Sequence, residues 1–340
     1  MNKTLLTIFH GMICASITCQ TTNTITAERN AYRPGDLIVK QQVEFKDPGP
    51  SGRGINWDFS MLNPVNEEYK IRYMLRTKTD STHIVANEHQ TSYRYLLAND
   101  TVWLYEYQNR TTKMTFTKPE AQLKFPFKYG DSLKSEFEAE GNYCEKVNLI
   151  AQGKTYTTMD GTGKLITPTH QTLQNVVRVR RVRDYNEIGI DSASLKLEVY
   201  SWYVAGFRYP VFETFITYIQ KADSIYEDFK TSFYYPIENP ENQYANDYII
   251  SRIEKVFTEG SYQPNPVISD LNISFKLTRE AKVWFTLHTN IGIPVCQTQV
   301  RNRSDGFNNT TINMSNLTTG TYSLYVHVDD MVMKQVIIKK

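Results

Sequence analysis

The sequence has few cysteines, and none of them has the spacing of a metal site. Four occur in 340 residues: Cys14 and Cys19 near the N-terminus, and Cys144 and Cys296 far apart in the remainder. Two such distant residues do not make a disulfide framework, and they do not have the close pairing of zinc ligands. We therefore expect Cys144 and Cys296 to be buried free thiols, and we expect neither a metal nor a cofactor.

Long apolar runs are equally scarce. Beyond the N-terminus, no segment approaches the roughly 20 apolar residues of a membrane-spanning helix, so we expect no transmembrane helix in the mature chain. The N-terminal residues MNKTLLTIFHGMICASITCQ combine a positive start, a short apolar stretch and small residues. This is the pattern of a secretory signal peptide, which we assign to residues 1–19. Lipidation at Cys19 is an open alternative, although the preceding Ser-Ile-Thr is a poor lipidation motif.

An excess of basic charge is also missing. The 38 Lys and Arg residues face 36 Asp and Glu residues, a formal net charge of +2. Nucleic-acid binding depends mainly on neutralising phosphates, so a near-neutral exported protein is not expected to bind nucleic acid. The local run NVVRVRRVRDY, residues 175–185, needs another explanation.

Alternation explains most of this arginine run. Val177 and Val179 share one face of a strand, whereas Arg178 and Arg180 share the other. Arg181 breaks the alternation, as the extra residue of a β-bulge does, and Val182 then points inward again. Arginines on an outer face pair with carboxylates of a neighbouring strand, for which the candidates are Glu136, Glu138 and Glu140. A polyanionic glycan is an alternative partner for Arg178 and Arg180.

Aromatic residues are abundant and favour strands. The chain has 23 Tyr, 16 Phe and 4 Trp, and such side chains suit pleated surfaces. Period-two alternation recurs from Asp36 onwards, with turn-forming segments between the short runs. One exception is YANDYIISRIEKVF, where Asp247 precedes apolar residues at helical spacing up to Phe257, which predicts a short helix. The pattern predicts an all-β fold: a large multi-stranded antiparallel sandwich or partly closed barrel at 28–258.

A hairpin can be placed within this region. SYRYLLA and TVWLYEY flank Asn99-Asp100, a two-residue turn. The resulting register pairs Ala98 with Thr101, Leu96 with Trp103 and Arg94 with Tyr105. Trp103, Tyr105 and Tyr107 then form an aromatic stripe on one face, which either packs in a core or stacks on sugar rings.

Beyond Gly260 the sequence changes character. SYQPNP has the composition of a linker, and about 75 residues with six or seven short strands follow. That length and strand count suit a small immunoglobulin-like β-sandwich at residues 262–340.

Motifs in this C-terminal segment carry a family likeness. PNPVISDLNISF, VWFTLHTNIGIPV and INMSNLTTGTYSLYVHV, with the basic end KQVIIKK, resemble the C-terminal sorting domain of the type IX secretion system of the Bacteroidetes. The resemblance implies a β-sandwich that directs cargo across the outer membrane and contacts the secretion machinery. INWDFS, FPFKYGDS and YPVFET have a looser likeness to segments of secreted Bacteroidetes proteins.

Catalytic motifs are not evident. Glu136 and Glu138 lie two apart on one strand, so their carboxyl groups are roughly 6.5–7 Å apart, which a pair of glycosidase carboxylates permits. DGTG, residues 160–163, reads as a glycine-rich hairpin or loop. His83 and His89 are too far apart on a strand to chelate one ion.

Together these features predict an exported protein, secreted or at the cell surface or outer membrane, that crosses the periplasm in transit. We expect a non-catalytic cell-envelope or extracellular protein that binds a glycan or a surface protein. The ligand-binding candidates are Trp103, Tyr105, Tyr107, Arg178 and Arg180. The alternative is a glycan-directed hydrolase that uses Glu136 and Glu138.

Overall fold

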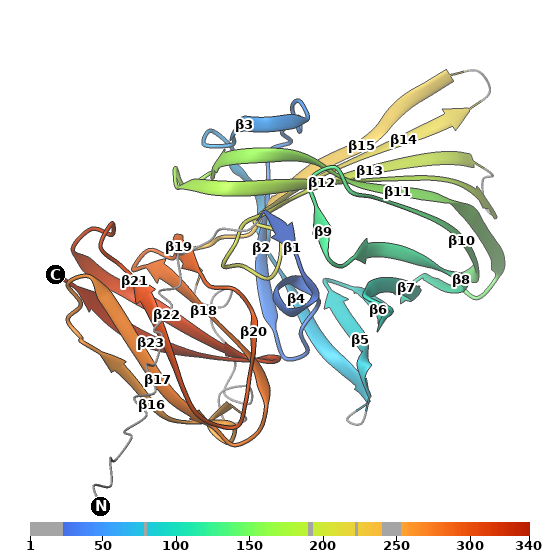
Figure 1. Ribbon diagram of the computed structural model, residues 1–340. Helices are drawn as coiled ribbons and strands as arrows, with labels where there is room; N and C mark the ends of the chain where they lie inside the picture. The colour runs from blue at the N-terminus through green and yellow to red at the C-terminus, as the bar shows by residue number, and fades with distance from the viewer. Residues whose placement is uncertain (1–22, 78–79, 190–192, 222–223, 240–252) are drawn as a thin grey trace, which may run out of the picture.

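The computed structural model describes residues 23–77, 80–189, 193–221, 224–239 and 253–340. The predicted signal peptide at residues 1–19, with Cys19, lies outside the described residues, and so does most of the predicted helix around Asp247. Strands dominate the described chain, as the alternation predicts (Figure 1).

Twelve of the described strands form one closed, barrel-like sheet. In chain order they are β2 (Leu37–Val43), β4 (Pro64–Thr77), β5 (Asp80–Glu88), β6 (Thr91–Ala98), β7 (Thr101–Gln108), β8 (Thr112–Lys124), β10 (Ser132–Tyr143), β11 (Val147–Ile166), β12 (Thr172–Ile188), β13 (Ala193–Tyr203), β14 (Phe212–Lys221) and β15 (Ser224–Tyr234). Each pairs antiparallel with the next, and β15 pairs with β2, which closes the sheet. This closing contact is short: only Ser232 to Tyr234 of β15 pair with β2.

The N-terminal segment covers one end of this closed sheet. β1 (Thr24–Ile25) pairs with β9 (Phe127–Lys128), and the short helix α1 (Ala27–Asn30) follows. Ile25 and Ala31 pack on inward-facing apolar side chains of the sheet, including Val177 and Val179. Arg208, from the loop between β13 and β14, donates hydrogen bonds to the carbonyl groups of Ala31 and Glu28, at 2.7 and 2.8 Å. These contacts fix the segment in place.

One further strand lies outside the ring. β3 (Gly52–Asp58) runs parallel to β11 and pairs with its second half, residues 161–166. This close approach requires glycine: a Cβ at Gly163 would lie 1.9 Å from the carbonyl oxygen of Ile55. The DGTG residues, 160–163, are therefore part of strand β11, and the expectation of a hairpin or loop is wrong. The glycines there allow the backbone of β3 to come close enough to pair.

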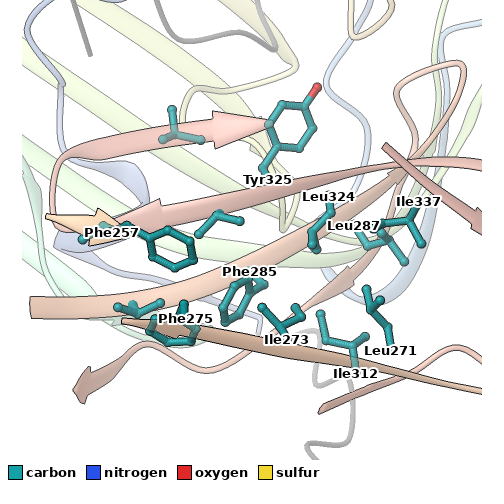
Figure 2. Packing of buried hydrophobic residues seen from close by; sticks show 14 of the residues in the cluster. Phe257, Leu271, Ile273, Phe275, Phe285, Leu287, Ile312, Leu324, Tyr325 and Ile337 are labelled. Atoms are coloured by element: carbon teal, nitrogen blue, oxygen red, sulfur yellow. The ribbon is translucent and has the colours of Figure 1, made fainter. Parts of the chain in front are cut away.

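The C-terminal strands form a separate pair of sheets. One contains β16 (Phe257–Gln263), β17 (Asp270–Leu277) and β21 (Gly306–Asn313); the other contains β18 (Ala281–Thr289), β19 (Pro294–Gln297), β20 (Arg301–Arg303), β22 (Gly320–Val328) and β23 (Met331–Lys339). Apolar side chains from both sheets fill the space between them (Figure 2). Such burial of alternate side chains is the main stabilising contribution in a small sandwich.

The start of this unit differs from the sequence-based expectation. Phe257, placed in a helix by its spacing, begins β16 and stacks on Phe275 with ring centroids 4.7 Å apart. Ser261 to Gln263, expected in a linker, pair with β17. Ile253 is also fully buried in this core. The C-terminal core thus includes residues that precede position 262. Its immunoglobulin-like topology stays a prediction.

Contacts join the two parts of the chain. Lys282 forms an ion pair with Glu28 at 2.7 Å, and Arg29 donates to the carbonyl of Thr298 at 3.0 Å. The Phe207 and His288 rings pack with centroids 5.3 Å apart. The N-terminal segment therefore lies between the closed sheet and the C-terminal sheets, as the blue ribbon shows (Figure 1).

The predicted hairpin is confirmed at its turn and corrected further along. Ala98 pairs with Thr101 and Leu96 with Trp103, and Asn99 and Asp100 have φ of 51° and 56°, as a type I′ turn needs. Arg94, however, pairs with Glu106 instead of Tyr105, because the register shifts between Arg94 and Tyr95.

The cysteine expectation is also wrong in part. Cys144 is free but exposed, because it lies in the tight turn between β10 and β11 with a φ of 51°. Cys296 is buried as expected, at 4% exposure, but it does not carry a free thiol.

Candidate ligand-binding cavity

A cavity of about 580 Å³ lies inside the closed sheet. Its size falls within the range of small-molecule sites in proteins. The wall is rich in tyrosine, with eight residues from the N-terminal segment, the strands and the β13–β14 loop: Tyr32, Tyr73, Tyr93, Tyr95, Tyr107, Tyr203, Tyr209 and Tyr235. Tyrosine offers both an apolar face and a hydroxyl group, so this wall suits a ligand that is itself partly polar.

The tyrosines near the covered end are packed into a cluster. Tyr73 stacks on Tyr209 with centroids 4.9 Å apart, and Tyr32 meets Tyr95 edge-on at 4.8 Å. Burial raises the pKa values of Tyr73, Tyr95 and Tyr209 well above their usual range. Their hydroxyl groups therefore stay protonated and can donate hydrogen bonds at any physiological pH.

Charged side chains also face the cavity. Glu120, which is 1% exposed, lies 3.5 Å from Arg181 and 3.3 Å from Arg183. Lys40 forms an ion pair with Glu88. The planar guanidinium of Arg183 also lies over the rings of Phe137 and Tyr185, at 4.3 and 4.1 Å. Pairing of this kind is what makes buried charges tolerable.

Glu213 is a further carboxyl group in the wall. It accepts hydrogen bonds from Ser201, at 2.7 Å, and from Tyr235. Burial raises its pKa, and the nearby Lys40 only partly opposes that shift. The charged form of Glu213 is therefore disfavoured relative to an exposed glutamate.

Several polar atoms around the cavity are buried without a hydrogen-bond partner. They include Nε2 of Gln122, Nε of Arg183 and Oε1 of Glu120. Leaving such an atom unpaired costs about 1–3 kcal/mol. These atoms are fully buried, so a ligand in the cavity cannot contact them as the side chains stand.

The cavity reaches solvent near β15. Phe229 belongs to the cavity wall and is nevertheless 54% exposed. Thr217, its neighbour across the β14–β15 pair, also lines the cavity. The cavity is therefore open to solvent on this side.

The predicted aromatic stripe is divided by the register shift in β7. Tyr107 lines the cavity, whereas Trp103 and Tyr105 do not. Tyr105 packs edge-on against His83 with centroids 5.6 Å apart, and Trp103 donates from its indole N–H to the carbonyl of Ala98. Only Tyr107 of these three stays a candidate for contact with a ligand inside the sheet.

The arginine run alternates without a bulge in β12, so that expectation is wrong. β12 pairs with β13 in continuous register from Val177 to Glu187. Val179, Arg181 and Arg183 consequently face the cavity, and Val182 faces outward. The irregularity lies instead in the partner strand β11, around Asp160.

Arg178 and Arg180 point away from the cavity, and their partners differ from those expected. Arg178 is 1% exposed because the loop before β3 and the rings of Trp57, Tyr200 and Trp202 surround it, and it pairs with Asp160; it is not on a solvated face. Arg180 pairs with Glu198 at 3.2 Å. Neither contacts Glu136, Glu138 or Glu140, because β10 pairs with β8 and β11 and not with β12.

Glu136 and Glu138 lie on the exposed outer surface of β10. The Glu136 side chain is 57% exposed and pairs with Lys118 at 2.8 Å, which lowers its pKa, and with Lys154 at 3.6 Å. Neither glutamate lines the cavity.

Sequence reasoning missed Arg181, Arg183, Glu120, Tyr93 and Tyr95. A signal for the two arginines was present, because strict alternation from Val179 onwards puts positions 181 and 183 on its face. The two tyrosines also had a signal, because alternation in the predicted hairpin puts Tyr93 and Tyr95 on one face, which the structure turns towards the cavity. Glu120 had none, since β8 meets β12 only when the sheet closes.

Two structural features, metal-ligand clusters and membrane-spanning helices, bear on function in the described part of the chain. No group of three or more His, Cys, Asp or Glu side chains there is placed to hold a metal ion. Among the same residues, no helix has the length and apolar composition needed to cross a bilayer.

Comparison with known proteins identifies the C-terminal sheets. Residues 262–340 match the family of the secretion system C-terminal sorting domain. No curated protein matches the chain. Cargo with this domain is carried by the type IX secretion system of the Bacteroidetes, through contact with the secretion machinery. The chain therefore carries a type IX secretion sorting domain at its C-terminus, and it is a protein exported to the cell surface or the extracellular space.

Proposed function

We propose that the protein is an exported, non-catalytic binding protein that holds a small glycan inside its closed sheet. The observation that carries this proposal is the cavity of about 580 Å³ with eight tyrosines in its wall. Sugars present apolar C–H faces that stack on aromatic rings and hydroxyl groups that need hydrogen-bond partners. The tyrosines of the wall offer both kinds of contact, through their rings and their hydroxyl groups.

A glycan fits this site better than the surface protein that the sequence also allowed. The aromatic and polar groups face an interior, which a folded partner cannot enter. The exposed Phe229 gives a small molecule a route from solvent. A signal peptide on residues 1–19 is part of the same proposal, since the chain must cross the inner membrane before the sorting domain acts.

Calorimetry with short oligosaccharides tests the proposal, with one variant that fills the cavity. Thr217→Trp places an indole in the cavity wall on β14, whereas Thr115→Trp places the same group on the exposed outer face of β8. We expect wild type and Thr115→Trp to bind a member of the panel equally, and Thr217→Trp to bind it at least about tenfold more weakly, which is about 1.4 kcal/mol.

Two results would overturn the proposal. Equal binding by Thr217→Trp and wild type would place the ligand outside the cavity. Cleavage of the oligosaccharide that is lost in Glu138→Gln would establish the hydrolase alternative.

A further inference from the structure

We infer that the cavity selects an acidic ligand, whose carboxylate or sulfate group binds beside Arg181 and Arg183. This inference rests on the proposed function, because it assigns the chemical class of the ligand in the same cavity. It starts from the inward-facing half of the arginine run. Positions 181 and 183 are two apart on β12, so their side chains leave the wall roughly 6.5–7 Å apart and can approach one anionic group together.

The charges around these arginines do not balance. Two guanidinium groups share one carboxylate, that of Glu120, which is the acidic group within 4 Å of either of them in the described residues. The other charged pair of the wall, Lys40 with Glu88, is internally neutral. This part of the wall therefore carries about one uncompensated positive charge in surroundings of low dielectric constant, where a charge attracts a counter-ion strongly.

The remaining acidic group does not correct the imbalance. Glu213 is engaged by Ser201 and Tyr235, and its charge is matched by that of Arg208, which also lines the cavity. Arg208 lies at the covered end of the cavity and uses its donors on the carbonyl groups of Ala31 and Glu28. The whole lining thus favours an anion over a neutral or cationic ligand.

The geometry at Glu120 leaves donors available. The Arg181 side chain is 22% exposed and that of Arg183 is 15% exposed, although both lie beside Glu120 and Arg181 also donates to Oε1 of Gln122. Guanidinium groups bind carboxylate and sulfate oxygens through paired, charge-assisted hydrogen bonds, which are stronger than neutral ones. An acidic sugar can therefore place its anionic group here and its ring against the neighbouring tyrosines.

A pair of probes that differ only in charge tests the inference. The probes are a glucuronate-terminated disaccharide and its glucose-terminated counterpart, titrated into the full-length mature protein by calorimetry. We expect the acidic probe to bind at least about tenfold more tightly, and the preference to shrink as salt is raised.

Variants with opposite expected effects separate binding from folding damage. Arg181→Gln removes one cavity cation and should weaken the acidic probe at least about tenfold. Glu120→Gln removes the competing carboxylate and should strengthen the same probe several-fold. Arg180→Gln changes the adjacent, outward-facing arginine and should leave the affinity unchanged.

The outcomes are distinguishable from failure of the proposed function. Suppose that neither probe binds wild type while a different, neutral oligosaccharide binds wild type and binds Thr217→Trp more weakly. In that case the cavity binds glycans, and the inferred preference for acidic ligands is wrong. Equal affinity for both probes, or a Glu120→Gln variant that binds the acidic probe more weakly while retaining its fold by circular dichroism, would also overturn the inference. If the Thr217→Trp substitution weakens the binding of no oligosaccharide, both the proposed function and this inference are wrong.

Discussion

Arg178 and Asp160 form a two-point ion pair on the outside of the closed sheet, next to the loop that precedes β3. Nε of Arg178 donates to Oδ1 of Asp160 at 2.8 Å, and Nη2 donates to Oδ2 at 3.0 Å. A third nitrogen, Nη1, donates to the carbonyl of Gly49 at 3.1 Å. The guanidinium of Arg178 thereby links the loop before β3 to strands β11 and β12.

Replacing Arg178 tests this tie. The guanidinium is also surrounded by the rings of Trp57, Tyr200 and Trp202, at 5.5, 5.2 and 5.8 Å. Arg178→Met leaves Asp160 without its partner, and breaking a buried pair typically costs about 3–5 kcal/mol. We expect a loss of that size in the free energy of unfolding, measured in denaturant.

The neighbouring arginine is the control for this measurement. Arg180 is 38% exposed and pairs with Glu198. Arg180→Met should cost below about 1 kcal/mol, because the half-exposed guanidinium is replaced while Lys196 still pairs with Glu198 at 2.6 Å. Equal losses of unfolding free energy in the two variants would show that the burial of Arg178 does not account for its contribution to stability.

A glycine in β11 tests the docking of β3. A Cβ at Gly163 would meet the carbonyl oxygen of Ile55 at 1.9 Å. Gly163→Ala should therefore separate β3 from β11 and cost about 1–3 kcal/mol, with faster proteolysis of residues 47–60. Lys164→Ala, an exposed change one position later, should leave both stability and proteolysis as in wild type.

The start of the C-terminal unit is tested by two phenylalanines. Phe257 is 4% exposed and stacks on Phe275, although it precedes the segment that matches the sorting-domain family. Phe257→Ala should cost about 3–5 kcal/mol in the unfolding of this unit. Phe307→Ala, in the same unit but 74% exposed, should stay within about 0.5 kcal/mol. A small effect of Phe257→Ala would place the boundary at residue 262 instead.

Two buried histidines make stability depend on pH. Burial lowers the pKa of His288 to about 3, and Lys334 adds to that shift. Burial also lowers the pKa of His327 well below its usual value, assisted by Arg33 and Arg208. Both rings are therefore neutral in the folded protein, whereas in the unfolded chain they titrate near pH 6.5.

The sign of the effect follows from proton binding. Below pH 6.5 the unfolded chain binds more protons at these positions than the folded chain, so stability falls as pH falls towards 3. We expect the free energy of unfolding to decrease over this interval, and His288→Gln to show a shallower slope. A slope that is unchanged in the variant would mean that His288 does not contribute.

The strand content of the chain could be predicted from the sequence, and so could the sorting domain in the last 79 residues, because both depend on local patterns. Alternation identifies strands, and short motifs such as Pro264-Asn265-Pro266 identify the sorting domain. The turn at Asn99 and Asp100 was equally local, since these residues tolerate positive φ.

The cavity could not be predicted, because it depends on which strands become neighbours. Glu120 comes from β8 and Arg183 from β12, about 60 positions apart, and they meet only across the interior of the closed sheet. Arg178 was misjudged for the same reason. A strand face that looks solvated in sequence is buried once the loop before β3 and the ring of Trp57 pack against it.

The most direct test of this account is a crystal structure of the mature protein grown with the glucuronate-terminated disaccharide. We predict electron density for the sugar inside the closed sheet, with its carboxylate beside Arg181 and Arg183. Density on the outer face, for example along Arg178 and Arg180 or beside Glu136 and Glu138, with an empty interior, would contradict it.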